Sequence, residues 1–419
     1  VFVTSQEDMD KVVGDRTKQQ GNDFSKIQAR FKTRVKLTSA DVEEVIRKRL
    51  LEKNSQGAAA LGMIYAAESA NFKTLFDFVD GGAGDGLILS DGTRLPADLA
   101  IVAPGVAPET SLAADAGVRL GAGGGIVVDA SHRTSAAHVW AIGDAALKTD
   151  AIDGEGLIVS MAGLANRHGR EVADAIVGAP VVAAPALGTG IVGVLGVTVA
   201  MTGWSERRAL AAGRRIRVVH THPMHHAGYY PGAQQLAMKL VIDADDDRIL
   251  GAQVVGRDGA DKRIDVIATA MAGGITASAL AGLELAYAPQ YASAKDPINL
   301  LGYVADNVRD GRTRTVQWHE LDAVRAAGAM LIDVRSEGEH AASSIPGAVN
   351  VPLDRLRDHH RELGDAPLVV HCQVGQRGHT AARLLEQLGH DVRNLDGGYL
   401  TWHAGTTAGS TAPHPEGAA

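Results

Sequence analysis

Hydrophobic and polar positions divide the chain into segments of different texture. Near the start, apolar residues recur at helical spacing after Ser39, a residue that can cap a helix. The apolar stripe consists of Val42, Val45, Ile46, Leu50 and Leu51. From residue 86 onward, short apolar runs alternate with turns that contain glycine, which favours strands. We therefore expect a helical segment over residues 1–80 and strand-rich domains after it.

The later part of the chain alternates predicted strands with predicted helices. Residues His138–Asp144 read as a buried strand, and a helix is predicted over Ala162–Val177. Further strands are predicted over Gln235–Ile242, Leu250–Val255, Met330–Val334, Pro367–His371 and Asp391–Leu395, and further helices over Asp261–Met271 and Thr380–Gly389. Residues 406–419 are expected to form a disordered tail. The pattern predicts a multidomain protein of α/β and α+β class.

Composition and charge narrow the class of protein. The 419 residues exceed one ordinary core and should form about two to four domains. The net charge of -8 argues against a nucleic-acid-binding protein, which needs a basic face. No apolar run of about eighteen residues and no leader-like start are present, so we expect no membrane partner and a cytoplasmic location. The single cysteine excludes an intramolecular disulfide and a CxxC site.

The final module, residues 314–405, contains several motifs in a fixed order. They are Leu331–Arg335, Glu339, Ile345–Pro352, His371–Gly378, Gly397–Gly398 and Trp402. This set closely resembles a single-domain rhodanese, a family of sulfurtransferases. One motif departs from the family's pattern, because Ser343–Ser344 stand where Gly-His usually precedes Ile-Pro-Gly. That histidine is usually structural, so we expect the change to affect stability rather than chemistry.

Cys372 is the candidate nucleophile of this module. It closes an apolar strand and precedes a short loop that leads into a helix, so backbone N–H groups can surround its sulfur. Such an anion-binding cradle favours a thiolate or persulfide at the mouth of the loop. The loop consists of Gln373, Val374, Gly375, Gln376 and Gly378, and Arg377 adds a cation. The resemblance implies that Cys372 takes sulfane sulfur from a small-molecule donor and passes it to a thiol acceptor. An inert buried cysteine is the alternative.

A second set of motifs precedes this module. It comprises residues 93–108, 125–129, 133–135 and 140–144. The set resembles the second half of the FAD-binding domain of pyridine nucleotide-disulfide oxidoreductases, placed over residues 84–184. The resemblance implies that Gly143 and Asp144 bring a carboxylate to the ribityl hydroxyls of FAD. It also implies that the helix with Ala162 and Ala165 points its positive N-terminus at the flavin.

Residues 187–305 resemble the dimerisation domain of the same family, and more closely that of coenzyme A disulfide reductases with a rhodanese tail. The motifs are His226–Ala233, Asp261–Asp265, Tyr287–Pro289 and Ser293–Pro297. The resemblance implies a homodimer through residues 188–300, in which Tyr229 and Tyr287 act at the partner's disulfide site. Packing with a hydrogen-bonded hydroxyl is the alternative role for these tyrosines.

Complete members of this family carry a GxGxxG turn for FAD, a redox cysteine and a second GxGxxG turn for NAD(P)H. In this sequence only Gly188–Gly193 fits the glycine pattern, and it runs into an apolar segment typical of a strand rather than a helix. We therefore expect FAD to lack its pyrophosphate-binding half here. NAD(P)H use is expected of the intact family only.

Residues 1–80 look unlike the flavoprotein family. The segments are 1–7, 24–31 and 37–54, and they resemble the part of a phage-defence P-loop ATPase that follows the Walker B strand. No Walker A loop accompanies them, so no ATPase is predicted. We interpret residues 1–80 as a helical segment of foreign origin.

Four histidines cluster within the dimerisation segment. They are His220, His222, His225 and His226. Their spacing does not give two pairs at helical i, i+4 positions, and no cysteine or carboxylate lies beside them in the sequence. We predict no metal site there and assign no metal ligand elsewhere in the sequence.

Three functions fit these observations. The first is a sulfurtransferase that carries persulfide on Cys372 and is fused to a truncated FAD-dependent disulfide reductase. The second is an FAD- and NAD(P)H-dependent coenzyme A disulfide or polysulfide oxidoreductase. The third is a non-enzymatic dimeric scaffold. The sequence favours the first, because the motifs for both dinucleotides are missing from it.

Overall fold

The computed structural model describes residues 87–88, 94–95 and 107–409. Contacts between residues divide the chain into two compact units, residues 1–105 with 407–419 and residues 106–406. In the first unit, strand β1 (Leu87–Ile88) pairs antiparallel with β2 (Arg94–Leu95). The helix predicted after Ser39, and residues 1–80 as a whole, lie outside the described residues.

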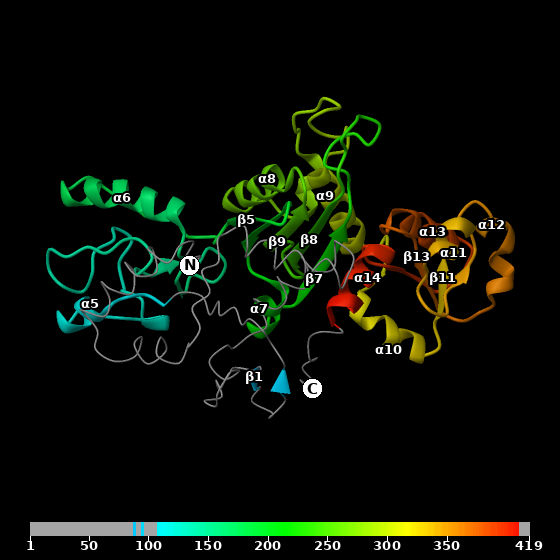
Figure 1. Ribbon diagram of the computed structural model, residues 1–419, viewed down its shortest axis with the longest axis horizontal. Coiled ribbons are helices and arrows are strands. Elements are labelled where there is room, and N and C mark those ends of the chain that lie inside the picture. Colours follow the sequence, from blue (N-terminus) through cyan, green and yellow to red (C-terminus); the bar gives the residue numbers. More distant parts are fainter. Residues whose placement is uncertain (1–86, 89–93, 96–106, 410–419) are drawn as a thin grey trace. The chain divides into compact units, whose positions relative to one another are not determined.

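Residues 107–186 are held by turns, isolated bridges and one long helix, α6 (Figure 1). The regular elements are α5 (Ser111–Asp115), the short helix η2 (Ala122–Gly124), β3 (Lys148–Thr149), β4 (Gly156–Leu157) and α6 (Ala162–Ile176). Helix α6 ends one residue before the predicted end and otherwise agrees with the prediction. Ile126 forms isolated bridges to both Leu120 and Ala146, which ties the loops of this region together.

The buried strand predicted over His138–Asp144 is wrong. Within it only Trp140 forms a bridge, to Arg133, while Val139 and Ile142 are exposed. A strand needs a partner along its edge to satisfy its backbone groups. The segment pairs with residues 132–134, where Thr134 N donates to the Val139 carbonyl and Ala141 N donates to the His132 carbonyl, and its other bonds, to Ala136, Ala146 and Lys148, are local. The segment therefore folds as an irregular hairpin rather than as a sheet strand.

Residues 187–310 form a five-stranded antiparallel sheet with two long helices. The strands are β5 (Gly190–Val194), β6 (Val197–Gly203), β7 (Ile216–Thr221), β8 (Leu236–Asp243) and β9 (Ile249–Gly256), in the order β5-β6-β9-β8-β7. The helices are α7 (Glu206–Ala211), α8 (Ala260–Ala272) and α9 (Pro297–Arg309). Alternate residues of β8 and β9 pack with α8 and α9 in the largest hydrophobic core. The predicted strands and helix of this region are confirmed to within one residue at each end.

The segment Gly188–Gly193 does not begin a nucleotide-binding turn. Strand β5 starts at Gly190 and pairs antiparallel with β6 across a two-residue turn, Leu195–Gly196, with both residues at positive φ. This is the geometry of a tight β-hairpin. The glycine pattern is therefore followed by a second strand, as expected, and not by a helix.

The final domain contains a five-stranded parallel sheet in the order β10-β14-β13-β11-β12. The strands are β10 (Thr315–Val316), β11 (Met330–Asp333), β12 (Val349–Asn350), β13 (Leu368–His371) and β14 (Val392–Leu395). The helices are α10 (Leu321–Ala326), α11 (Glu337–Ala342), α12 (Leu356–His359), α13 (Gln376–Gln387) and α14 (Gly398–Gly409). Cores on both faces of the sheet bury β11 and β13 almost completely, as expected for parallel strands.

The tail predicted to be disordered from residue 406 is wrong in its first part. Helix α14 continues to Gly409, and the Thr406 hydroxyl donates to the Trp402 carbonyl one turn earlier. Side chains earlier in the helix, such as Tyr399 and Trp402, pack into the core and support the following turn. Residues 410–419 lie outside the described residues. No helix of the described residues is both long and apolar enough to cross a membrane.

Candidate functional site

The Cys372 loop joins strand β13 to helix α13 at the carboxyl edge of the parallel sheet. Gly375 precedes the helix with φ of +88°, a left-handed conformation that glycine adopts without strain. Among the described residues, no hydrogen-bond acceptor is found for the backbone N–H groups of Val374 and Gly375. Free N–H groups at the start of a helix bind anions. The loop residues Gln373, Val374, Gly375, Gln376 and Gly378 thus lie together, and their role stays a prediction.

Cys372 itself is completely buried, with 0% of its surface exposed. It directly precedes the loop, as predicted, but its side chain is not open to solvent. The start of α14 is bonded to the loop, since Tyr399 N donates to the Cys372 carbonyl at 2.8 Å and Leu400 N donates to the Gln373 carbonyl at 3.0 Å. A side chain at Gly398 would collide with the Cys372 carbonyl oxygen, so glycine is required there. The burial leaves the inert cysteine as an open alternative.

Arg377 forms the ionic part of the site with Glu339 of α11. Its two terminal nitrogens donate to the two carboxylate oxygens at 2.8 and 2.6 Å. The hydrogen bond to Glu339 raises the pKa of Arg377, and the Cys372 side chain adds a smaller effect in the same direction. The same pair holds the pKa of Glu339 at about 2. Arg377 is thus a fixed cation close to the sulfur, although its role in sulfur transfer stays a prediction.

A second cation lies beneath the loop and was not assigned a role from the sequence. Arg335 is buried, and its guanidinium donates to both oxygens of Asp333 at 2.8–3.0 Å. It also donates to the Gln373 side chain at 3.0 Å and lies 4.6 Å from the Tyr399 ring centre. Burial works against the ionised form of Asp333, but hydrogen bonds led by that from Arg335 bring its pKa below the ordinary value. In the sequence, the Asp-Val-Arg triplet at the end of a predicted strand could have indicated this buried ion pair.

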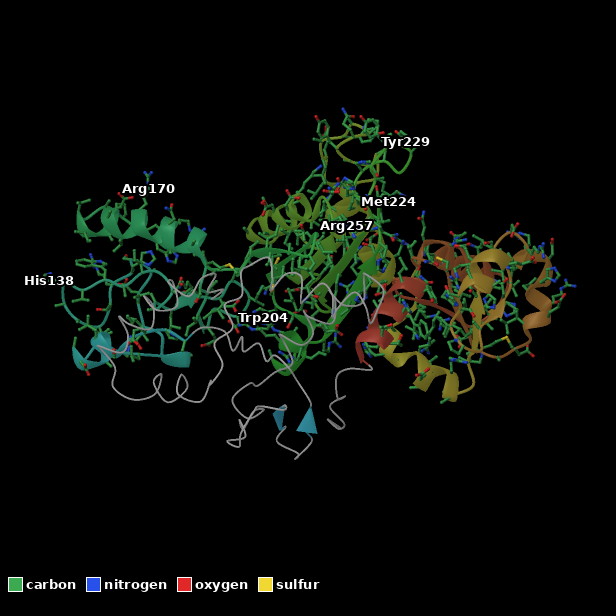
Figure 2. All side chains as sticks on the ribbon, in the orientation of Figure 1. His138, Arg170, Trp204, Met224, Tyr229 and Arg257 are labelled. Atoms are coloured by element: carbon green, nitrogen blue, oxygen red, sulfur yellow. The ribbon has the colours of Figure 1, made fainter. Side chains whose placement is uncertain are left out.

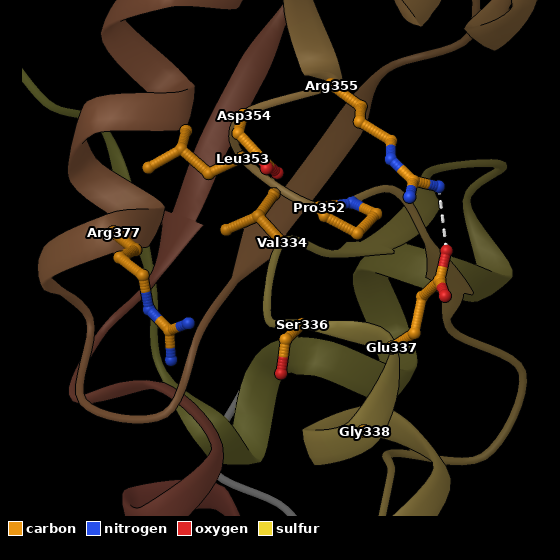
Figure 3. A pocket seen from close by; sticks show the side chains of 9 residues that line it. All are labelled: Val334, Ser336, Glu337, Gly338, Pro352, Leu353, Asp354, Arg355 and Arg377. Atoms are coloured by element: carbon orange, nitrogen blue, oxygen red, sulfur yellow. Dashed lines mark hydrogen bonds and ion pairs between the residues drawn. The ribbon is translucent and has the colours of Figure 1, made fainter.

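A pocket of about 680 Å³ opens beside the loop (Figure 3). Its lining residues are Val334, Ser336, Glu337, Gly338, Pro352, Leu353, Asp354, Arg355 and Arg377. In Figure 3 the Arg377 side chain lies on one side of the pocket, and the Arg355–Glu337 ion pair of 2.7 Å lies across from it. Cys372 is not among the lining residues. The pocket is therefore lined by two arginines, two carboxylates and a serine, and Arg377 connects it to the Cys372 loop.

Tyr229 and Tyr287 lie together, as the resemblance implied. Their hydroxyls are 3.1 Å apart, and both side chains are exposed, Tyr229 by 77%. The hydrogen bond to Tyr229 raises the pKa of Tyr287. Figure 2 shows Tyr229 on a loop that extends beyond the sheet of its domain. The hydrogen bond between the two hydroxyls agrees with the alternative of a hydrogen-bonded structural role, and the role at a partner's site stays a prediction.

The predicted FAD contacts lie at two features of residues 107–186. Asp144 is exposed, and the preceding Gly143 has φ of +78° with its carbonyl accepting from the Lys148 ammonium. Helix α6 starts with Ala162 after Met161, and no side chain caps its first N–H groups. Ala165 follows on the first turn and is half-buried. An exposed carboxylate and an uncapped helix start fit the ribityl and ring contacts of a flavin.

The four histidines of the dimerisation segment each have protein partners. His220 donates its backbone N–H to Asp396 at 3.0 Å, and its Nδ1 lies 2.7 Å from the same oxygen. His222 Nε2 lies 2.7 Å from the Thr401 hydroxyl, and burial lowers the pKa of His222 to about 3. The other two bond locally, His225 to Gln234 and His226 to the Ala227 carbonyl. Two of these histidines therefore connect the dimerisation domain to the final domain.

Three protein families match the chain. Residues 27–169 match the pyridine nucleotide-disulphide oxidoreductase family, residues 191–297 match its dimerisation domain, and residues 317–405 match the rhodanese-like domain. The chain thus consists of pyridine nucleotide-disulfide oxidoreductase domains followed by a C-terminal rhodanese domain. Its homologues are coenzyme A disulfide and persulfide reductases. The match to the dimerisation domain supports the predicted homodimer.

Individual relatives cover part of this architecture. An NAD(P)H coenzyme A polysulfide/persulfide reductase from Pyrococcus horikoshii is 33% identical over 52% of this chain and 48% of its own length. A coenzyme A disulfide reductase from Staphylococcus aureus is 32% identical over 54% of this chain and 52% of its own. Reduced CoADR-RHD from Bacillus anthracis superposes with a TM-score of 0.73 at 43% identity, covering 78% of this chain and 59% of that one. The chain spans about half the length of the curated relatives it matches.

These matches change two of the sequence predictions. The relatives are oxidoreductases, so they favour the FAD- and NAD(P)H-dependent hypothesis over the truncated sulfurtransferase. The oxidoreductase match begins at residue 27, within the segment interpreted as foreign, and the resemblance to a phage-defence ATPase finds no support. The resemblances to the oxidoreductase family and to the rhodanese domain are confirmed.

Proposed function

We propose that the chain belongs to an FAD- and NAD(P)H-dependent reductase of coenzyme A disulfide or coenzyme A persulfide, whose rhodanese domain carries sulfane sulfur on Cys372. The main support is the union of reductase domains and a rhodanese loop in one chain. A rhodanese moves sulfur without reducing it, and a persulfide reductase needs a delivered persulfide. Joined together, they form a route from a sulfur donor to sulfide.

The transfer steps balance with thiol and persulfide chemistry alone. The Cys372 thiolate attacks the sulfane sulfur of a donor R–S–SH, the donor S–S bond breaks, and R–S⁻ leaves. The thiolate of coenzyme A then attacks the outer sulfur of the Cys372 persulfide, restoring the Cys372 thiolate and giving coenzyme A persulfide. A hydride equivalent from NAD(P)H finally converts coenzyme A persulfide into coenzyme A thiol and HS⁻. FAD, when bound, relays the two electrons between NAD(P)H and the sulfur.

The pocket beside the loop supports an anionic donor. Arg377, which is paired with Glu339, provides a cation at the pocket, and the amides of Val374 and Gly375, for which no acceptor is found among the described residues, lie at the start of α13. Developing negative charge on sulfur is stabilised by such fixed donors without reorganisation. Because Cys372 is buried, the donor must enter past Arg377 or the start of α14 must move.

The reductase half requires a second copy of the chain in this proposal. The exposed Tyr229–Tyr287 pair is assigned to the partner's reducing site rather than its own. Asp144 and the start of α6 would hold the ribityl chain and ring of FAD. These residues bind and orient the cofactor, and the tyrosine hydroxyls can donate a proton to a leaving thiolate.

The experiment uses the full chain purified in the presence of added FAD. Its visible spectrum reports flavin, NAD(P)H oxidation with coenzyme A persulfide reports reduction, and thiocyanate formation from thiosulfate and cyanide reports sulfur transfer. We expect Cys372→Ser to lower thiocyanate formation about 1,000-fold, because the nucleophile is lost. With coenzyme A persulfide supplied directly, the same variant should match the NAD(P)H oxidation rate of the parent chain, because Cys372 takes no part in that step of the proposal.

Two outcomes would contradict parts of the proposal. Equal thiocyanate formation by the wild type and Cys372→Ser would remove Cys372 as the sulfur carrier. A colourless protein that forms thiocyanate but oxidises no NAD(P)H would leave the sulfurtransferase as the function of this chain. Tyr229→Phe with Tyr287→Phe tests the partner role, since normal reduction by the double variant would exclude it.

A further inference from the structure

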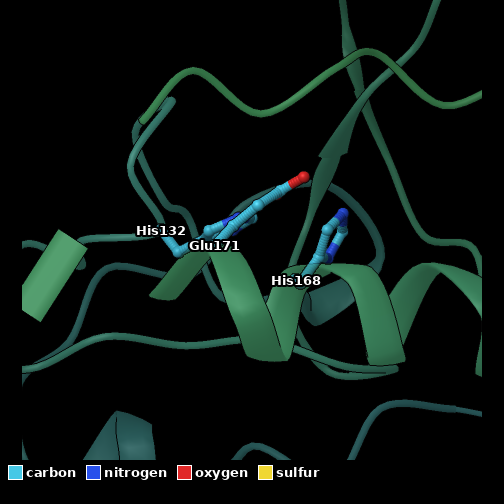
Figure 4. Close-up of side chains that lie close together, drawn as sticks. All are labelled: His132, His168 and Glu171. Carbon is cyan, nitrogen blue, oxygen red and sulfur yellow. The ribbon is translucent and has the colours of Figure 1, made fainter. Parts of the chain in front are cut away.

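Three ligand-type side chains converge in residues 107–186, away from the rhodanese site (Figure 4). His168 and Glu171 lie three residues apart on α6, so they share one face of the helix. His132 comes from the first arm of the irregular hairpin and meets them there. Its Nε2 is 2.7 Å from a Glu171 carboxylate oxygen, and the two imidazole ring centres are 4.6 Å apart. One ligand-type atom from each residue lies within 4.8 Å of the other two.

The burial of this cluster is the second observation that points to a ligand. His132 and His168 are only 3% and 4% exposed. The His168 Nδ1 atom is buried and finds no hydrogen-bond partner among the described residues. An unsatisfied buried nitrogen costs free energy, and native proteins rarely keep one without a bound ion, a water or a function. A packing role alone leaves this nitrogen unexplained.

The donor types also suit a metal. Imidazole nitrogen and carboxylate oxygen are both common ligands of transition metals. Two cations lie nearby: Arg167 is 3.6 Å from the other Glu171 oxygen, and Lys148 donates to the carbonyls of Gly143 and Ala146. Arg167 and Lys148 are each held by these partners, and their positive charges would repel a metal ion bound at the cluster.

We propose that His132, His168 and Glu171 form a site for a divalent metal ion of the zinc class. Two imidazoles and one carboxylate are a ligand set that zinc takes with a fourth position open to water or another ligand. Ligand atoms around a tetrahedral zinc ion lie about 3.3 Å apart. The 2.7 Å contact between His132 and Glu171 therefore has to lengthen by about 0.6 Å when both bind one ion. The site is independent of the proposed reductase and sulfurtransferase functions.

The test uses Zn²⁺ as the probe on the full chain with the Cys372→Ser change, which removes the thiol as a competing ligand. After treatment with a chelator, calorimetric titration with Zn²⁺ measures stoichiometry and affinity. Titration with Co²⁺ adds the visible absorption that distinguishes tetrahedral ligation. We expect one ion per chain, and we expect His168→Gln to weaken binding at least about tenfold, the loss typical of a disrupted metal site.

His138→Gln is the matched control, since His138 is an exposed histidine of the same region (Figure 2). It should bind Zn²⁺ like the parent chain. Glu171→Gln is the second ligand variant and should weaken binding as well. Circular dichroism in chelator identifies any variant that fails to fold, and the other ligand variant then decides the test. Equal affinity for the parent and the folded ligand variants, or no tight site in the parent, would overturn the proposal.

Discussion

The rhodanese domain and residues 107–186 organise their backbones in opposite ways. The rhodanese domain completes a five-stranded parallel sheet within one continuous stretch of chain and buries β11 and β13 on both faces. Residues 107–186 contain strands of only two residues and expose Leu112, Val177 and Val182 by 80% or more. The oxidoreductase match extends upstream to residue 27, beyond the described part. The two regions therefore differ in whether one continuous stretch of chain supplies all the strands of a sheet.

The two regions also hold buried polar groups differently. In the rhodanese domain, buried Asp333 and Arg335 satisfy each other, and Arg335 also donates to Gln373 of the Cys372 loop. Buried nitrogens without a partner among the described residues occur in both regions, at His168 and at His371. Among the described residues, only His168 stands in a group of ligand-type side chains, which is why its open nitrogen points to a ligand.

Gly398→Ala should break the order of the rhodanese loop most strongly. The new methyl group would collide with the Cys372 carbonyl oxygen and lie 2.7 Å from Gly375 N, at φ of +65°. We expect a loss of more than about 3 kcal/mol of unfolding free energy and a matching loss of sulfur transfer. Gly389→Ala is the control, because its φ is also positive but its surroundings are open, and about 1–2 kcal/mol is expected. Urea denaturation measures both losses of unfolding free energy. Equal losses for Gly398→Ala and Gly389→Ala would contradict the close packing of the loop.

The free energy of unfolding of the rhodanese domain should depend on pH because of buried His371. Burial lowers the pKa of His371 from 6.5 to about 4. Between these values the unfolded chain binds a proton that the folded chain does not, so stability is complete above pH 6.5 and falls as the pH drops towards 4. The loss is up to about 3 kcal/mol. His371→Gln should remove this slope, and a wild-type protein equally stable at about pH 7 and about pH 4.5 would contradict it.

Hydrogen exchange measures the comparison directly. Amides of β11 and β13 should exchange at least about 100-fold more slowly than amides of residues 107–146, where few regular hydrogen bonds hold the backbone. Exchange followed by mass spectrometry on the full chain resolves both regions at once. Similar protection in the two regions would show that isolated bridges hold the backbone as well as a parallel sheet does.

The smallest effect is expected from Glu339→Gln. The Arg377 hydrogen bonds depress the pKa of Glu339 from 4.5 to about 2, so its contribution to stability is present above pH 4.5 and is lost as the pH falls through 2. Both side chains are more than a third exposed, so solvent screening limits the change to at most about 1 kcal/mol. Sulfur transfer should respond more than stability if Arg377 needs this partner to stay near Cys372. Unchanged transfer in Glu339→Gln would make the pair a surface ion pair only.

Much of the rhodanese domain could be predicted from sequence because its signals are local. The strands Met330–Asp333 and Leu368–His371 are short apolar runs, and the turn before α13 carries the required glycine. The burial of Cys372 could not be predicted, because residues 398–400, which are bonded to the loop, follow it by some 26 positions in sequence. The ion pair of Arg377 with Glu339 also joins separate helices, which periodicity does not connect.

The prediction failed where tertiary context decides the structure. His138–Asp144 has the composition of a buried strand, yet strand formation depends on a neighbouring strand that the local sequence does not supply. The cluster of His132 with α6 was missed because no spacing rule links a loop histidine to a helix 36 residues later. The four histidines between 220 and 226 are close in sequence, but His220 and His222 bond to Asp396 and Thr401 rather than to one another.

The contact between His220 and Asp396 limits how well the rhodanese domain can be transferred to another protein. Asp396 is only 2% exposed. Its carboxylate accepts a hydrogen bond from the His220 backbone N–H and lies 2.7 Å from the His220 Nδ1. A side chain at the neighbouring Gly397 would lie 2.8 Å from the His220 Cβ. A rhodanese domain transplanted from this chain to another host would leave that carboxylate with Gln317 as its remaining side-chain donor among the described residues. The unit that can be exchanged between proteins is therefore larger than the family boundary at residue 317, and a successful graft would have to bring strand β7 with it.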